Sequence, residues 1–220
     1  MKNSKPPRER SSSEGLIQTF AVSVLALLIG LAVIFIATDR GHAFTTEALR
    51  RSEVARAPQR IPDFPLLDPH GQHTTLHQLL AADGRVWIVD FVYTRCQTIC
   101  TSLGSVYQQL QQQMLARDVQ DKVGLLSISF DPSNDDAAAL QAYATRMRMN
   151  PAAWNIATLS RAQDRRRLLD AFGIMVVPAP LGEFEHNAAL HIVDAQGWLL
   201  QIMDYNAPGQ AIDLALATRS

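Results

Sequence analysis

Cys96 and Cys100 are the only cysteines of the 220-residue chain, and they stand four residues apart. On the first turn of a helix, that spacing puts two side chains on one face, where the sulfurs can approach each other or a common atom. The N–H groups of a helix start and the neighbouring Arg95 both favour the thiolate form. Thiolates bind soft metals and attack disulfides, so the pair predicts either a metal site or a redox site.

A structural disulfide is the simplest alternative. A disulfide within the chain can only join Cys96 to Cys100, because the sequence holds no other cysteine. It would close a loop of about five residues, and loop-closure stabilisation is smallest for short loops. A purely structural role is therefore the less favoured interpretation.

The cysteine pair stands between a predicted strand and a predicted helix. Apart from Asp90, residues 86–93 are β-branched or aromatic, which is typical of a buried strand. A small turn at Thr94 and Arg95 follows, and apolar residues then recur at helical spacing from Leu103 to about Ala116. The two cysteines therefore sit where a strand is followed by a helix.

The other patterns alternate strands with helices. Expected helices, with their caps and stops, lie at 46–56, 76–81, from 134–136 to about 149, from Ser160 to Gly173, and at 208–217. Expected strands flank a turn at 69–71, lie buried at 123–130 and 153–157, and form a hairpin at 188–193 and 198–203, after an irregular loop at 174–186. This order predicts an α/β fold, a thioredoxin-like central sheet flanked by helices.

The N-terminal part contains a long uncharged run. Residues 16–38 carry no charged side chain and match the roughly 20 residues that span a bilayer as a helix. The run exceeds the apolar region of a cleavable signal peptide, about 7–15 residues, so we expect one uncleaved transmembrane anchor. The expected organisation is a tail at 1–15, the anchor at 16–38, a tether at 39–60 and one domain at 61–220.

The charge distribution gives the expected orientation. Four basic residues precede the apolar run, namely Lys2, Lys5, Arg8 and Arg10. The positive-inside tendency then puts the N-terminal tail in the cytoplasm and the domain outside, on the periplasmic side of a bacterial inner membrane. The formal net charge is −1, which gives no electrostatic reason to expect nucleic acid as a partner.

Three motifs in order carry a resemblance to a known family. They are Phe-Val-Tyr-Thr-Arg-Cys-Gln-Thr-Ile-Cys at 91–100, Ser-Ile-Ser-Phe-Asp-Pro at 127–132, and the stretch 186–197 that begins with His-Asn. Together they resemble the Sco/SenC proteins, which are membrane-anchored copper chaperones of cytochrome c oxidase assembly. The likeness runs from about residue 61 to residue 203.

The resemblance implies a set of copper ligands. The family binds copper through both cysteines of a C-x3-C motif and one distant histidine, which correspond here to Cys96, Cys100 and His186. Two thiolates suit Cu(I), and an added imidazole also accommodates Cu(II). The oxidised form is expected to hold a disulfide between Cys96 and Cys100, which removes both thiolates and blocks copper binding.

Other residues near these motifs are weighed separately. We expect His191 to be packed or at the surface, because an odd separation from His186 within one strand sends the two side chains to opposite faces. Asp131 matches a family position. Gln97 and Thr101 stand where the family often has proline, which leaves the cysteine turn less rigid.

The function implied by the resemblance is copper delivery to the binuclear copper centre of a haem-copper oxidase subunit. Other periplasmic copper chaperones or thiol reductants are further expected partners. The alternative is a thiol-disulfide oxidoreductase that keeps the target's cysteines reduced; it needs Cys96 and Cys100 but not His186. The usual redox motif, C-x-x-C, is one residue narrower than this pair, and the Thr-x-x-Cys motif of a peroxidase is not evident.

Overall fold

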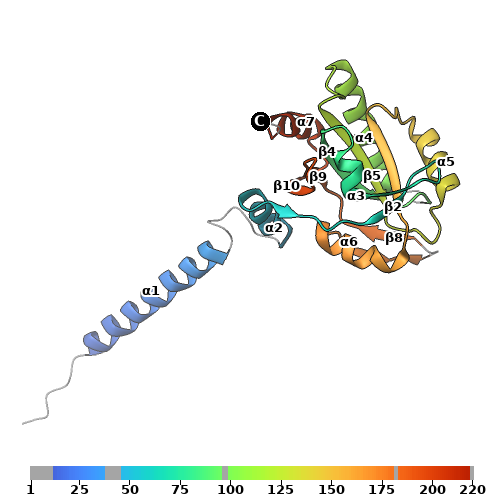
Figure 1. The fold of residues 1–220 in the computed structure, drawn as a ribbon. Helices are drawn as coiled ribbons and strands as arrows, with labels where there is room; N and C mark the ends of the chain where they lie inside the picture. The colour runs from blue at the N-terminus through green and yellow to red at the C-terminus, as the bar shows by residue number, and fades with distance from the viewer. Residues whose placement is uncertain (1–11, 38–45, 96–98, 181–182, 219–220) are drawn as a thin grey trace, which may run out of the picture. The chain divides into compact units, whose positions relative to one another are not determined.

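The computed structural model describes residues 12–37, 46–95, 99–180 and 183–218 (Figure 1). It divides into two compact units, Met1–Ser52 and Glu53–Ser220, and most of the fold belongs to the second.

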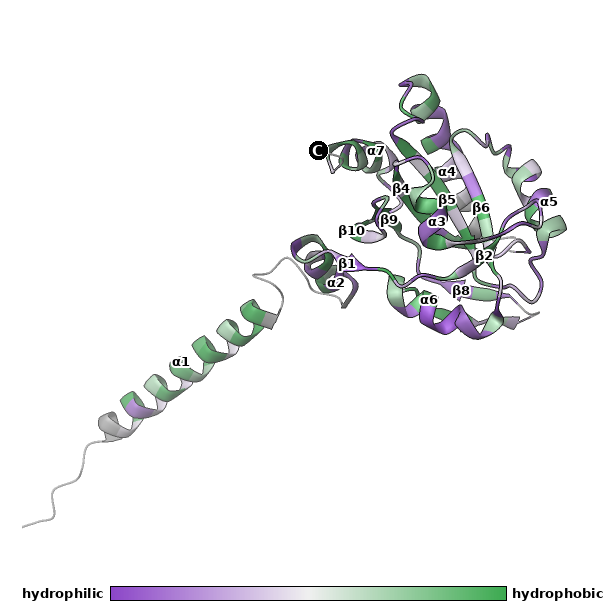
Figure 2. Cartoon of the chain, in the orientation of Figure 1, coloured by the Kyte–Doolittle hydropathy of each residue, from purple (hydrophilic) through white to green (hydrophobic). Residues whose placement is uncertain are grey.

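The first unit contains one long apolar helix. Helix α1 (Ser12–Ala37) includes the stretch Gly15–Ile36, which is long and apolar enough to cross a membrane. Its large hydrophobic side chains are exposed, and in Figure 2 most of the ribbon of α1 has the green of hydrophobic residues. A signal sequence meets the same criteria of length and composition. Helix α2 (Thr46–Arg56) follows with the bounds expected from the sequence.

The second unit is built around one mixed sheet. Among the described residues, eight strands pair in the order β1-β10-β9-β4-β5-β6-β2-β3. The neighbours β4, β5 and β6 are parallel, and β9 runs antiparallel to β4. The strands are β1 (Gln59–Arg60), β2 (Pro65–Leu67), β3 (His73–Thr75), β4 (Val86–Val92), β5 (Val123–Ser129), β6 (Trp154–Leu159), β9 (Leu190–Val193) and β10 (Trp198–Met203).

Helices cover both faces of this sheet (Figure 1). Alternate side chains of β4 enter opposite cores, as the two-residue period of a strand requires: Trp87 and Phe91 pack with α3 and α6, whereas Val86 and Ile88 pack with α4 and α7. The helices are α3 (Leu76–Ala81), α4 (Ile99–Ala116), α5 (Ala137–Met147), α6 (Arg165–Phe172) and α7 (Pro208–Ala217). The expected α/β sheet flanked by helices is therefore confirmed.

Two local expectations are wrong. Ser160 does not cap a helix: its N–H is bonded to the Pro65 carbonyl of β2, and the helical segment starts as a 3-10 turn at Ala162–Asp164 before α6. The segment at 174–186 is not simply irregular, because β7 (Val176–Pro178) and β8 (Phe184–His186) pair as a separate antiparallel ladder. Its strands have three residues each and one holds a proline, so the sequence shows no strand-like alternation there.

Candidate metal centre

The thiol side of the candidate centre follows β4. Cys100 lies in the first turn of α4, and Cys96, with Gln97, lies outside the described residues. The side chains of both cysteines and of Thr101 are likewise outside them, so the expected pairing of the sulfurs stays a prediction. The chain that leads to Cys96 is described through Arg95 and shows how the turn is supported.

Asp135 supports the chain just before the cysteine turn. Its side chain is fully buried and accepts hydrogen bonds from the Thr94 N–H at 2.9 Å, from the Thr94 hydroxyl at 2.6 Å and from the Ser129 hydroxyl. On the other side, Arg146 of α5 donates to the Thr94 carbonyl at 2.8 Å. Both main-chain groups of Thr94, two residues before Cys96, are therefore held by charged side chains.

The cation next to Cys96 is shared with a carboxylate. Arg95 Nη2 lies 3.2 Å from Asp131 Oδ2, and the Asn134 amide donates to both oxygens of Asp131. Asp131 is 4% exposed. The cation that the sequence places beside Cys96 is thus paired with Asp131, and its expected effect on the thiols stays a prediction.

His186 is the last residue of β8 and is 8% exposed. Its Nδ1 lies 3.1 Å from the main-chain oxygen of Asn187. A carbonyl oxygen only accepts, so Nδ1 is the nitrogen that carries a hydrogen in this contact, and in the neutral form of the ring the lone pair is then on Nε2. The ring also meets the edge of Phe130, with centroids 5.3 Å apart and planes at 76°. The imidazole is thus held in one orientation by the Asn187 carbonyl and the Phe130 ring.

Tyr93 and Phe130 connect the thiol side to the imidazole side. The Tyr93 hydroxyl, three residues before Cys96, donates to the Glu183 carboxylate and accepts from the Phe184 N–H at 3.1 Å. Its ring meets Phe184 and Phe130 at centroid distances of 5.3 and 5.6 Å. The segment that leads into Cys96 and the strand that ends at His186 therefore lie side by side.

His191 has a structural position. It is 1% exposed, with Nδ1 at 3.2 Å from the Val89 carbonyl and Nε2 at 3.1 Å from the Phe172 carbonyl. It is therefore packed, one of the two expected alternatives. The reason given from the sequence is wrong, because His186 belongs to β8 and His191 to β9.

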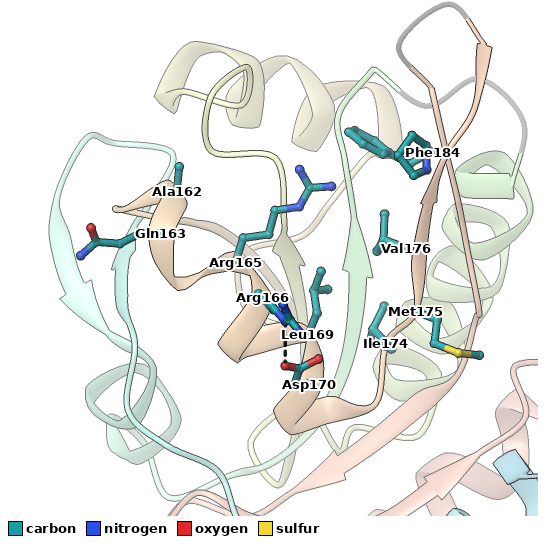
Figure 3. A pocket seen from close by; sticks show the side chains of 11 residues that line it. Ala162, Gln163, Arg165, Arg166, Leu169, Asp170, Ile174, Met175, Val176 and Phe184 are labelled. Carbon is teal, nitrogen blue, oxygen red and sulfur yellow. Dashed lines mark ion pairs between the residues drawn. The ribbon is translucent and has the colours of Figure 1, made fainter.

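A groove lies beside the hairpin that carries His186. It has a volume of about 630 Å³ and runs between α6 and the β7–β8 hairpin (Figure 3). The Arg165 guanidinium stands 4.6 Å from the Phe184 ring centroid and 5.4 Å from that of Phe130. Val176, on the groove wall, is paired in register with His186. A molecule seated in the groove would therefore approach the strand that carries His186.

A second buried carboxyl lies farther back on β4. Asp90 is 1% exposed, and among the described residues its Oδ1 has no hydrogen-bond partner. Burial raises the pKa of Asp90 to about 7, although a hydrogen bond with Ser127 partly opposes the shift. The Ser127 oxygen also accepts from the Trp154 indole at 2.9 Å. This carboxyl belongs to the core under α4.

Three supporting residues were missed from the sequence: Tyr93, Asp135 and Asn187. Asp135 carried a weak signal, as one of several residues expected to cap a helix; the helix is in fact capped by Asp136, which accepts the Ala139 N–H at 2.9 Å. Among the side chains that the structure describes, no three His, Cys, Asp or Glu residues meet as a metal-holding group.

Comparisons with known proteins agree on one family. The SCO1/SenC family model matches residues 52–219. The SCO1 protein homolog of Bacillus subtilis (strain 168) is 28% identical over 149 residues, which cover 66% of this chain and 73% of that protein.

Solved structures share the fold. The SCO1/SenC family lipoprotein of Bacillus anthracis str. Ames has a TM-score of 0.64 and 23% identity, and the match covers 74% of this chain and 97% of that one. Bradyrhizobium japonicum ScoI, solved with copper bound, has a TM-score of 0.57 and 22% identity, with coverage of 73% and 98%. At these identities, the two comparisons show a likeness of fold alone.

Proposed function

Because the chain belongs to the SCO1/SenC family, we propose that it binds copper through Cys96, Cys100 and His186 and delivers it to the binuclear copper centre of cytochrome c oxidase. The copper is cargo: it is taken up as Cu(I) or Cu(II) and handed to the copper-accepting subunit of the oxidase.

The observation that carries this proposal is the junction at Tyr93. Through its hydroxyl and ring, Tyr93 joins the strand that leads into the cysteine turn to Phe184, two residues before His186. A soft-metal site of two thiolates and one imidazole needs those two segments at one place. The expected tautomer of His186, with the lone pair on Nε2, is the form in which an imidazole binds a metal.

We further propose that α1 anchors the protein in the inner membrane, with its N-terminal tail in the cytoplasm and the domain in the periplasm. The uncharged span and the basic residues before it support this orientation. A periplasmic domain would meet the oxidase subunit on the outer side of the membrane, and other copper chaperones or thiol reductants there as well.

Copper binding by the full chain in detergent tests the proposal. The reduced protein should bind one copper per chain, and Cu(II) should give the sulfur-to-copper charge-transfer absorption of a bound thiolate. Oxidised protein should bind none, because the disulfide removes both thiolates. His186→Ala should weaken Cu(II) binding severely and Cu(I) binding less, whereas His191→Ala, corrected for any loss of folded protein, should bind as the parent does. Equal copper uptake by reduced and oxidised protein would contradict the proposal.

A second candidate is a thiol-disulfide oxidoreductase, favoured by the thioredoxin-like sheet with a cysteine pair directly after its central strand. This function uses sulfur chemistry alone, so it does not need His186. If His186→Ala supports oxidase assembly in cells as well as the parent while both cysteines remain essential, the oxidoreductase becomes the better assignment.

A further inference from the structure

Asn187, directly after His186, uses both ends of its side-chain amide. Its Oδ1 accepts the Met175 N–H at 2.7 Å, and its Nδ2 donates to the Gly173 carbonyl at 3.1 Å. An N–H needs an acceptor and a carbonyl needs a donor, so these two contacts fix which end of the amide is which. The side chain therefore crosslinks the end of β8 to residues 173–175.

The main chain of Asn187 completes the connection. Its N–H donates to the Met175 carbonyl at 3.3 Å, and its own carbonyl oxygen lies 3.1 Å from His186 Nδ1. The carbonyl that contacts the imidazole therefore belongs to a residue that Met175 holds twice, once through the side-chain amide of Asn187 and once through its main-chain N–H. Moving Asn187 would move the acceptor that faces the ring.

Residues 173–175, to which the Asn187 side chain is hydrogen-bonded, are themselves fixed in the fold. Gly173 ends α6 in the left-handed conformation, at φ 65°, and its N–H is bonded to the Asp170 carbonyl. Next to it, Ile174 is 5% exposed and belongs to the core cluster that includes Phe172. Asn187 therefore ties His186 to the packed end of a helix and not to a loose loop.

We propose that Asn187 is the positioning residue of the imidazole ligand: it pins the end of β8 to the turn after α6, and its carbonyl keeps the hydrogen on His186 Nδ1. Nε2 is then the nitrogen that meets copper. The role in copper binding rests on the proposed function. Groups that orient a metal-binding histidine typically change metal affinity by about 10- to 100-fold when they are removed.

Packing alone does not select the tautomer. The edge contact with Phe130 sets the plane of the His186 ring but does not tell its two nitrogens apart. The carbonyl of Asn187 does, because it can only accept a hydrogen bond. The tautomer of His186 in the copper-free protein is therefore the property that reports on Asn187.

Three variants of the full chain in detergent form the test. Asn187→Ala removes both side-chain contacts; Asn187→Asp keeps the acceptor for Met175 N–H but loses the donor to Gly173. Asn150→Ala is the matched control: Asn150 Oδ1 accepts the Ala152 N–H at 3.0 Å just before β6, at the opposite end of the parallel strands from the cysteine turn. Long-range 15N–1H spectra of histidine-labelled, copper-free protein read the tautomer, with His186→Gln assigning the signal.

The proposal predicts a graded result. Asn187→Ala should mix the two tautomers of His186 and weaken Cu(II) binding by about 10- to 100-fold, with a smaller change in Asn187→Asp. Dithiol redox cycling should stay as in the parent, and Asn150→Ala should match the parent in every readout. If Asn187→Ala fails to fold, Asn187→Asp carries the test.

Two outcomes would overturn the positioning role. One is a parent tautomer in Asn187→Ala with parent Cu(II) binding, and the other is weakened Cu(II) binding with an unchanged tautomer. Failure of the copper proposal looks different: His186→Ala would bind Cu(II) like the parent, while the tautomer change in Asn187→Ala would still show that Asn187 positions the ring.

Discussion

The chain entering the cysteine turn and the hairpin that carries His186 are held by different kinds of contact. On the thiol side, the fully buried carboxylate of Asp135 accepts three hydrogen bonds and Arg146 takes up the Thr94 carbonyl. On the imidazole side, the contacts made by His186 and Asn187 themselves involve a neutral amide, main-chain groups and an aromatic ring edge. The thiol side should therefore tolerate loss of a single partner much less well, because a buried charge network leaves several unpaired groups when one member is removed.

The largest effect is expected at Asp135. Asp135→Ala leaves the Thr94 N–H, the Thr94 hydroxyl and the Ser129 hydroxyl without their buried acceptor, which should lower the free energy of unfolding by about 3–5 kcal/mol. Urea denaturation measures it. Asp136→Ala is the neighbouring control, since Asp136 is exposed and only caps α5, a loss of about 1 kcal/mol. Equal losses of unfolding free energy in the two variants would contradict the claim that the thiol side depends on its buried charge network.

Asp90 is a buried carboxyl outside this network, and its Oδ1 has no hydrogen-bond partner among the described residues. Its folded pKa of about 7 lies above that of an unfolded aspartate, about 3.9, so between these values the folded state holds a proton that the unfolded state lacks. Its contribution to stability should fall as pH rises from about 4 to about 7 and then level off, by about 2–4 kcal/mol in total.

Asp90→Asn should remove that slope, because an amide does not titrate. Urea denaturation from about pH 5 to about pH 8 gives the free energy of unfolding of parent and variant at each pH. The difference between the two is the pH-dependent contribution of Asp90. A pH-independent difference would mean that Asp90 is ionised in the folded protein over this pH range, as it is in the unfolded chain, and would contradict the raised pKa.

A smaller loss is expected at the junction of the two sides. Tyr93→Phe removes the hydroxyl that bonds Glu183 and Phe184, which should cost about 1–2 kcal/mol of stability and perturb the Cu(II) charge-transfer band. The matched control is Tyr107→Phe, whose hydroxyl donates to the Ile88 carbonyl at 2.9 Å in the core under α4. Tyr107→Phe should lose similar stability with an unchanged copper spectrum. A copper spectrum altered equally in the two variants would contradict the claim that Tyr93 connects the cysteine turn to the strand that carries His186.

The smallest effect is expected at Arg95. The Arg95 side chain is 53% exposed, so its ion pair with Asp131 is screened by solvent. Arg95→Gln should change the free energy of unfolding by less than about 1 kcal/mol, and raising the salt concentration should shrink the difference further. A loss as large as that of Asp135→Ala would show that the exposed side of the turn is as tightly coupled as its buried side.

The sequence predicted the sheet well because its signals are local. The β-branched run of β4 and the turn before Trp198 specify strands without knowledge of distant partners. The β7–β8 ladder was missed because short strands with a proline are stabilised by neighbours such as Tyr93, which is about 90 residues away in the chain. The support of the site was missed for the same reason: Asp135 and Asn187 look like ordinary cap or loop residues until the fold brings Thr94 and Met175 to them.

X-ray absorption at the copper edge tests the central claim most directly. For the reduced full chain loaded with Cu(II), the account predicts two sulfur ligands and at least one imidazole nitrogen, with the imidazole signal lost in His186→Ala and the sulfur signal retained. A copper environment of nitrogen and oxygen alone in the parent, or an unchanged imidazole signal in His186→Ala, would contradict it.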